Sequence, residues 1–123
     1  MRNLLSLPIA AVAVAFAVVP AYCAGDVAKG EKEFAKCGFC HAKGKGNGIG
    51  PGLSGVIGRH AGSVSGFAYS EAMKNSNIVW DEKSLDAFIT APQTAVPGTT
   101  MPFPGLMDAG ERNDLIAYLE TLK

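Results

Sequence analysis

Two cysteines and a histidine, Cys37, Cys40 and His41, stand within five residues in the stretch "EFAKCGFCHAKGKG". The chain has only 3 cysteines and 2 histidines, so this grouping points to a shared chemical task. The spacing Cys-x-x-Cys-His is the attachment signature of c-type haem. The two thiols form thioether bonds to the porphyrin vinyl groups, and the histidine that follows is close enough to bind the iron. The motif therefore predicts one covalently attached haem c with its iron.

Three other interpretations of these residues compete with haem attachment. A redox-active thiol pair has the same Cys-x-x-Cys spacing, but it belongs to a thioredoxin-like α/β pattern that this sequence lacks. A structural zinc needs four ligands, and the remaining candidates are only Cys23, in the N-terminal apolar segment, and His60, in a Gly-rich segment. A disulfide between Cys37 and Cys40 would close a very small ring and stabilise little. Haem attachment is favoured over all three.

A methionine could supply a second ligand to the iron. Of the 4 methionines, Met1 lies in the N-terminal segment, Met73 is predicted to pack within a helix, and Met107 is predicted to fill the core at a helix entrance. Met101 stands in "VPGTTMPFPG", where prolines stiffen an extended loop, and a stiff loop suits a weak thioether ligand. From the residues alone, Met101 is either that ligand or an apolar loop residue.

Residues 1–24 have the layout of a secretory signal peptide: Arg2, then an apolar run over residues 4–19, then small and helix-breaking residues. The run is short for a transmembrane anchor, which needs about 20 apolar residues, although a retained anchor stays the alternative. Cleavage between Ala21 and Gly25 would leave residues 25–123 as one exported domain.

The charges of the chain balance, with 11 Lys or Arg against 11 Asp or Glu. No basic block with interleaved aromatic residues is present, so nucleic acid is a poor candidate partner.

The elements that must position these residues read as helices joined by long loops. Residues 26–39 are predicted to be helical, with one face formed by Val27, Gly30, Phe34 and Cys37. Ser70 is predicted to cap a short helix that ends at Asn75.

Two further helices are predicted in the second half. Asp81 caps the first, and Pro92 stops it; its inner face is Leu85, Phe88 and Ile89. Asp108 and Glu111 resemble a capping box for a last helix that runs to Leu122, with Leu115, Ile116, Leu119 and Leu122 facing inward.

The Gly/Pro-rich segments 41–66 and 93–105 are predicted to be loops, and loops this long are unusual in a small compact domain. No convincing strand appears, and the middle of the chain is short of apolar residues. A large apolar cofactor would fill such a core. The predicted class is all-α, with three to five helices and long loops wrapped around one covalently bound haem.

The chain resembles the class I cytochromes c, especially the mitochondrial-like soluble carriers of bacteria. The stretches that carry the resemblance span residues 25–123 in the right order: "GDVAKGEKEFAKCGFCH", "GPGLSGVIGRHAG", "FAYSEAM", "VPGTTMPF" and "ERNDLIAYL". The resemblance implies the cytochrome c fold.

The resemblance also implies roles for individual residues. His41 and Met101 would be the two iron ligands, and the carbonyl of Pro51 would accept the other imidazole proton. Gly30 and Phe34 would contact the last helix. The haem propionates would be held by residues that match known positions, namely Arg59, Tyr69, Trp80 and Thr99.

Two departures from the family pattern stand out. Phe88 occupies a position where many relatives have a tyrosine near the methionine ligand, so one hydrogen bond to that sulfur is absent. The segment "APQTAVPGTTM" has none of the lysines that ring the haem edge in mitochondrial carriers, while Lys36, Lys43 and Lys45 remain. Electrostatic steering of partners is therefore expected to be weaker.

The resemblance implies a monomeric, soluble periplasmic electron carrier rather than an enzyme, without stable membrane insertion. Its redox partners would be a quinol-oxidising complex or dehydrogenase as donor, and an oxidase, reductase or reaction centre as acceptor. The alternative is a haem-c sensor or peroxidase-like enzyme whose methionine ligand dissociates.

Overall fold

A computed structural model of the chain describes residues 12–15 and 24–123. Apart from 12–15 and Ala24, the expected signal peptide lies outside the described residues. Regular structure consists of helices: α1 (Val27–Glu33), a 3-10 turn (Phe34–Lys36), α2 (Glu71–Lys74), α3 (Glu82–Thr90), α4 (Pro92–Ala95) and α5 (Ala109–Glu120). Within these ranges the only β pairing is an isolated bridge between His60 and Val79. The all-α prediction is confirmed.

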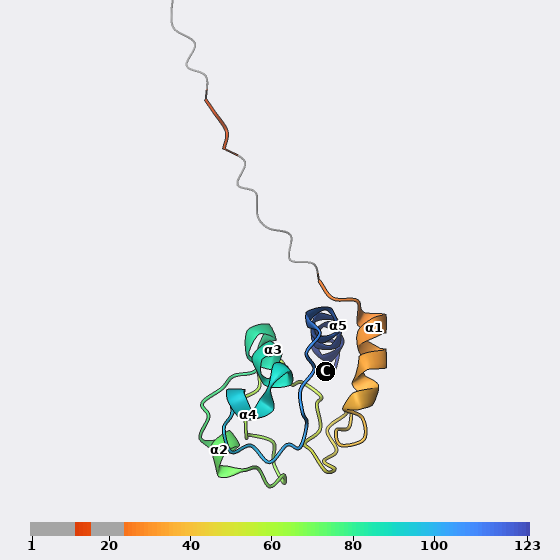
Figure 1. Cartoon of the computed structure of the whole chain (residues 1–123), viewed down its shortest axis with the longest axis vertical. Coiled ribbons are helices and arrows are strands. Elements are labelled where there is room, and N and C mark those ends of the chain that lie inside the picture. The colour runs from red at the N-terminus through yellow and green to blue at the C-terminus, as the bar shows by residue number, and fades with distance from the viewer. Residues whose placement is uncertain (1–11, 16–23) are drawn as a thin grey trace, which may run out of the picture.

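The first and last helices, α1 and α5, pack side by side (Figure 1). Gly30 makes this approach possible, because a Cβ atom there would lie 1.9 Å from the backbone oxygen of Asp114 and 2.8 Å from the Cβ of Tyr118. One turn further, the ring of Phe34 lies 5.4 Å from that of Tyr118. The expected contact of Gly30 and Phe34 with the last helix is present.

The first helix ends earlier than the spacing predicted. α1 stops at Glu33, and a 3-10 turn replaces its continuation. The backbone then closes tightly, since the amides of Cys37 and Gly38 both donate to the carbonyl of Phe34. Val27 was also wrongly placed on the inner face, because its side chain is 45% exposed.

Side-chain caps begin three of the other helices where the sequence predicted them. The Ser70 hydroxyl accepts from the amide of Met73 at the start of α2. Asp81 and Ser84 form a reciprocal capping box at α3. The Asp108 carboxylate accepts from the Glu111 amide at the start of α5. These caps satisfy amides that the first helical turn leaves without partners.

Pro92 does more than stop α3. It also occupies the first turn of α4, where a missing N–H costs nothing and the fixed φ of proline suits a helix. The segment Gln93–Ala95 is therefore helical, and the prediction of extended loop there was wrong.

Helix α5 packs against both α1 and α3 (Figure 1). The core is built by α3 and α5 together with Phe34 of the 3-10 turn and with residues of the irregular segments, among them Val56, Trp80, Val96 and Leu106. Met73 is buried, as predicted. Met107 is 78% exposed, so its prediction as core filler was wrong. Met107 lies just before Asp108, the residue whose side chain caps α5.

Candidate functional site

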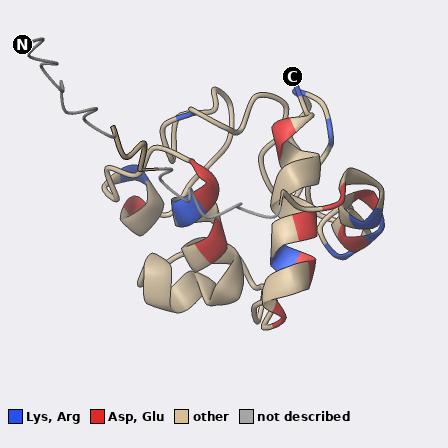
Figure 2. Cartoon of the chain, turned by 90° about the horizontal axis from the view of Figure 1, so that it is seen from above, with Lys and Arg blue, Asp and Glu red and all other residues tan. Residues whose placement is uncertain are grey.

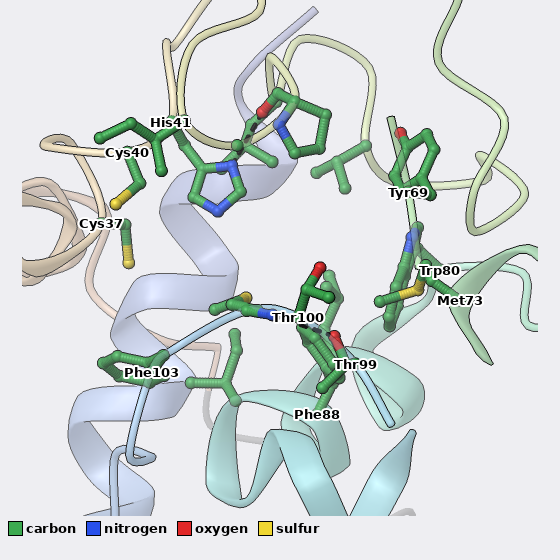
Figure 3. Close-up of a pocket in the computed structure, with 18 of the residues that line it drawn as sticks. Cys37, Cys40, His41, Tyr69, Met73, Trp80, Phe88, Thr99, Thr100 and Phe103 are labelled. Atoms are coloured by element: carbon green, nitrogen blue, oxygen red, sulfur yellow. Dashed lines mark hydrogen bonds between the residues drawn. The ribbon is translucent and has the colours of Figure 1, made fainter. Parts of the chain in front are cut away.

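Cys37, Cys40 and His41 lie on one tight turn that follows α1. The amides of Cys40 and His41 both donate to the carbonyl of Cys37, at 3.0 and 2.9 Å. Both thiols are free and line the same cavity as the imidazole (Figure 3). Burial raises the pKa of the Cys37 thiol, and the neighbouring Cys40 raises it further. A thiol that is kept protonated is a poor redox nucleophile, which disfavours the thiol-pair interpretation.

The imidazole of His41 is fixed by a backbone contact. Its Nδ1 lies 2.8 Å from the carbonyl oxygen of Pro51. A carbonyl can only accept, so Nδ1 carries the proton and donates it. The other ring nitrogen, Nε2, is then left with its lone pair for a metal. The expected contact between His41 and Pro51 is present.

Gly50 packs directly against the same ring. A Cβ atom at this position would lie 2.5 Å from Cε1 of His41, 2.7 Å from Nδ1 and 2.9 Å from Nε2. The amide of Gly50 also donates to the carbonyl of Cys40 at 2.8 Å. Only a residue without a side chain leaves room for the ring here. Sequence reasoning missed this role, although the "GPG" stretch already marked a tight loop.

The cavity has a volume of about 440 Å³. Apolar side chains from the helices and from both long loops dominate its walls, among them Leu53, Val56, Met73, Leu85, Phe88, Ile89, Phe103 and Leu115. A porphyrin is a large apolar plate, and such a cavity suits it. The thiols and the imidazole lie on one side, and Thr99 and Phe103 lie across from them (Figure 3).

Arg59 brings a positive charge to the cavity wall. Its guanidinium donates to the carbonyl oxygens of Gly52 and Ser54, at 3.0 and 3.3 Å. Burial lowers the pKa of this guanidinium. Within the described part of the chain it forms no ion pair with a carboxylate. A half-buried cation that lacks an anion suits a cofactor that carries carboxylates.

The other residues expected near the propionates also line the cavity. Trp80 is buried, with its ring 5.2 Å from that of Phe88. Tyr69 accepts a hydrogen bond from the amide of Val64 through its hydroxyl, at 3.2 Å. Thr99 is 6% exposed. The structure thus brings Arg59, Tyr69, Trp80 and Thr99 to one cavity, and the donor groups that they carry match the chemistry of a haem.

Met101 lies half-buried in the loop between α4 and α5 and lines the cavity. Its amide donates to the Thr99 hydroxyl at 3.4 Å. On the far side of Met101, the amide of Leu106 donates to the carbonyl of Ile89 at 2.9 Å, which ties the loop to the end of α3. The methionine is thus carried by a loop that is held on both sides.

His60 does not join this site. Its side chain is exposed, and its backbone pairs with Val79. Among the described residues, no three His, Cys, Asp or Glu side chains gather in a way that could hold a metal ion. Cys23 lies outside the described residues.

The comparisons with known proteins agree with this geometry. The family model for Cytochrome c matches residues 27–123. The chain is 52% identical over 102 residues to cytochrome c2 of Rhodoblastus acidophilus, covering 81% of this chain and 95% of that protein. It is 48% identical over 103 residues to cytochrome c2 of Rhodomicrobium vannielii, covering 82% of each. Among solved structures, cytochrome cH from Methylobacterium extorquens matches with a TM-score of 0.76 and 48% identity, over 79% of this chain and 99% of that one.

Proposed function

The chain belongs to the cytochrome c family, and from this premise we propose that it is a periplasmic carrier that shuttles single electrons through a haem ligated by His41 and Met101. Like its family, it carries one covalently attached haem c, and Cys37 and Cys40 stand at the attachment positions. It is an electron carrier by family. What we propose beyond the family is that His41 and Met101 bind the iron, which redox partners the protein has, and that it works in the periplasm.

The contact between His41 and Pro51 is the observation that carries the proposal. It fixes the tautomer in which Nε2 can bind iron, and it raises the basicity of the ring. Met101 lines the same cavity on a tethered loop. With both residues as ligands, no coordination position remains for a substrate, which favours electron transfer over catalysis.

When bound, the haem supplies a one-electron ferric–ferrous couple, and His/Met ligation raises its potential. The residues of the chain contribute the surroundings. The apolar walls exclude water from the cavity, and Arg59, Tyr69, Trp80 and Thr99 supply donors for the propionates. Because the tethered turn and loop keep the ligands in place, little structure has to move when the charge of the cofactor changes.

The proposed compartment rests on the signal-peptide layout of residues 1–24. No described helix has both the length and the apolar character needed to cross a bilayer. We propose a quinol-oxidising complex or a dehydrogenase as electron donor, and an oxidase, reductase or reaction centre as acceptor.

Two of the lysines near the Cys-x-x-Cys-His motif are paired with carboxylates, which supports weak electrostatic steering of these partners. The Lys36 ammonium lies 2.5 Å from the carboxylate of Glu33 and 3.3 Å from that of Glu111, and Lys43 pairs with Glu31 at 3.2 Å. Acidic and basic residues are interspersed along the ribbon (Figure 2), and α5 carries a single arginine among its acidic residues.

The ligand assignment is tested by replacing Met101 with leucine in the matured, haem-loaded protein. We expect the weak far-red absorption of Met-ligated ferric iron to vanish, the potential to fall, and carbon monoxide to bind the reduced variant quickly. Met107→Leu is the matched control, because that side chain is 78% exposed. If Met101→Leu kept the far-red band, or if the unaltered protein bound carbon monoxide as quickly as the variant, the ligand assignment would be wrong.

A further inference from the structure

One side chain of the short helix α4 forms hydrogen bonds with the loop that carries Met101. The amide nitrogen of the Gln93 side chain donates to the carbonyl oxygen of Thr99 at 2.7 Å. The amide oxygen of the same side chain accepts from the backbone N–H of Gly98 at 3.4 Å. Both ends of the Gln93 amide are therefore used, and both contacts go to the loop.

The loop at these contacts is a tight turn. The Thr99 amide donates to the carbonyl of Val96 at 3.0 Å, and Gly98 has a φ of +93°, which favours glycine. Thr99 connects this turn to the methionine, because its hydroxyl accepts a hydrogen bond from the amide of Met101. A restraint on the Thr99 carbonyl is transmitted to Met101 through two peptide units.

No other side-chain amide or hydroxyl from α3 or α4 restrains this loop within the described residues. Phe88, the α3 residue that faces the cavity nearby, has no hydroxyl to offer. The far side of the loop is held by the backbone bond from Leu106 to Ile89 and by Arg112 of α5, whose side chain donates to the carbonyls of Leu106 and Met107. Gln93 therefore provides the side-chain restraint on the near side of Met101.

We propose that Gln93 is a positioning residue that keeps the Met101 sulfur in place and thereby limits the access of external ligands to the iron. This inference rests on the proposed ligation by Met101. A bond of 2.7 Å to the carbonyl of a buried residue is well suited to the task. Because the amide is neutral, the restraint does not depend on pH.

The test measures how quickly imidazole binds to the ferric, haem-loaded protein at saturating imidazole, where departure of the methionine limits the rate. In Gln93→Ala we expect this rate to rise about three- to tenfold, as for the loss of one neutral hydrogen bond. Thr94→Ala is the matched control, since Thr94 is an exposed neighbour on the same helix, and it should leave the rate unchanged.

A second variant, Gln93→Glu, separates the two contacts. At pH 7 the carboxylate can still accept from Gly98 but can no longer donate to Thr99. We expect it to bind imidazole faster than the unaltered protein, because the shorter bond is lost and the carboxylate would face the carbonyl oxygen of Thr99.

The outcomes are distinguishable. Imidazole rates like those of the unaltered protein in both Gln93 variants would overturn the inference and leave the ligation by Met101 standing. So would a lower unfolding temperature without a faster rate, because that pattern describes a purely structural residue. Absence of the far-red band in the unaltered ferric protein would overturn both the inference and the proposed ligation.

Discussion

At the scale of single residues, the ring of His41 is held from two sides. The Pro51 carbonyl fixes which nitrogen carries the proton, and Gly50 fixes how far the ring can rotate. The first contact is electronic and the second is steric. If His41 binds iron as proposed, these two contacts would return its ring to the same orientation after each change of charge.

The steric contact is tested by Gly50→Ala. The added Cβ would lie 2.5 Å from Cε1 of His41, so the ring has to rotate or shift, and its bond to Pro51 weakens. We expect a changed pattern of paramagnetically shifted haem resonances in ferric-protein NMR spectra. We also expect a higher potential, because a less basic imidazole would stabilise the ferric state less.

The control is Gly46→Ala in the same loop, where an added Cβ meets nothing within 4 Å and where the backbone φ is not positive. It should leave the resonances and the potential as they are. Identical NMR spectra for both variants would show that Gly50 does not orient the ring.

Residue identity could be predicted where chemistry fixes the spacing. Cys37, Cys40 and His41 follow from the motif alone, and the Pro51 contact followed from the resemblance. Gly50 and Gln93 were missed, because their roles depend on which atoms the fold brings next to them. The propionate contacts of Arg59, Tyr69, Trp80 and Thr99 remain predictions, although all four side chains line one cavity.

At the scale of elements, the crossing of α1 and α5 depends on the absence of a side chain at Gly30. Replacing a helical glycine with alanine gains about 1 kcal/mol of helix propensity in an open position. Here the new Cβ would stand 1.9 Å from a backbone oxygen of α5, and backbone cannot give way as a side chain can. Overpacking of this severity costs about 3 kcal/mol or more, so the clash outweighs the gain.

We therefore expect Gly30→Ala to lower the free energy of unfolding by about 2 kcal/mol or more. Denaturant titration of the haem-loaded protein, followed by far-UV circular dichroism, measures it. Lys32→Ala, at an exposed position of α1, should change the free energy by much less. A Gly30→Ala protein as stable as its parent would mean that the two helices can move apart at little cost.

Elements with a side-chain cap were predictable: α3 and α5 have several periodic apolar residues as well, and the short α2 was predicted from its Ser70 cap. The end of α1 was not, because helical spacing continues through Phe34 and Cys37 while the backbone tightens to form the Cys-x-x-Cys-His turn. α4 was missed because Pro92 was taken only as a stop signal. It also has no side-chain cap, and a helix of four residues has too little periodicity to be recognised without one.

At the scale of the whole molecule, the cavity is large relative to what a small domain can tolerate. A cavity of about 440 Å³ leaves many apolar wall atoms without contacts when no cofactor fills it, and the loss of such contacts is destabilising. A typical domain has a free energy of unfolding of only about 5–15 kcal/mol. The sequence is short of apolar core residues, and this cavity occupies the volume that such residues would otherwise fill.

We expect the chain to be largely unfolded without haem. The measurement is far-UV circular dichroism and amide hydrogen exchange on residues 25–123 made without haem, with the haem-loaded protein under identical conditions as the reference. Helical signal should be mostly lost, and exchange should approach the rate of an unstructured peptide. A compact haem-free form with protected amides in α1 and α5 would contradict this expectation.

The position of the two thiols also sets the order in which the protein can be assembled. Cys37 and Cys40 are only partly exposed, and they line a cavity whose other walls come from segments far downstream. An attachment enzyme would reach them more easily in the unfolded chain than in the folded one. Haem attachment is therefore expected to precede folding. A mutation that made the haem-free chain fold faster would compete with attachment instead of assisting it.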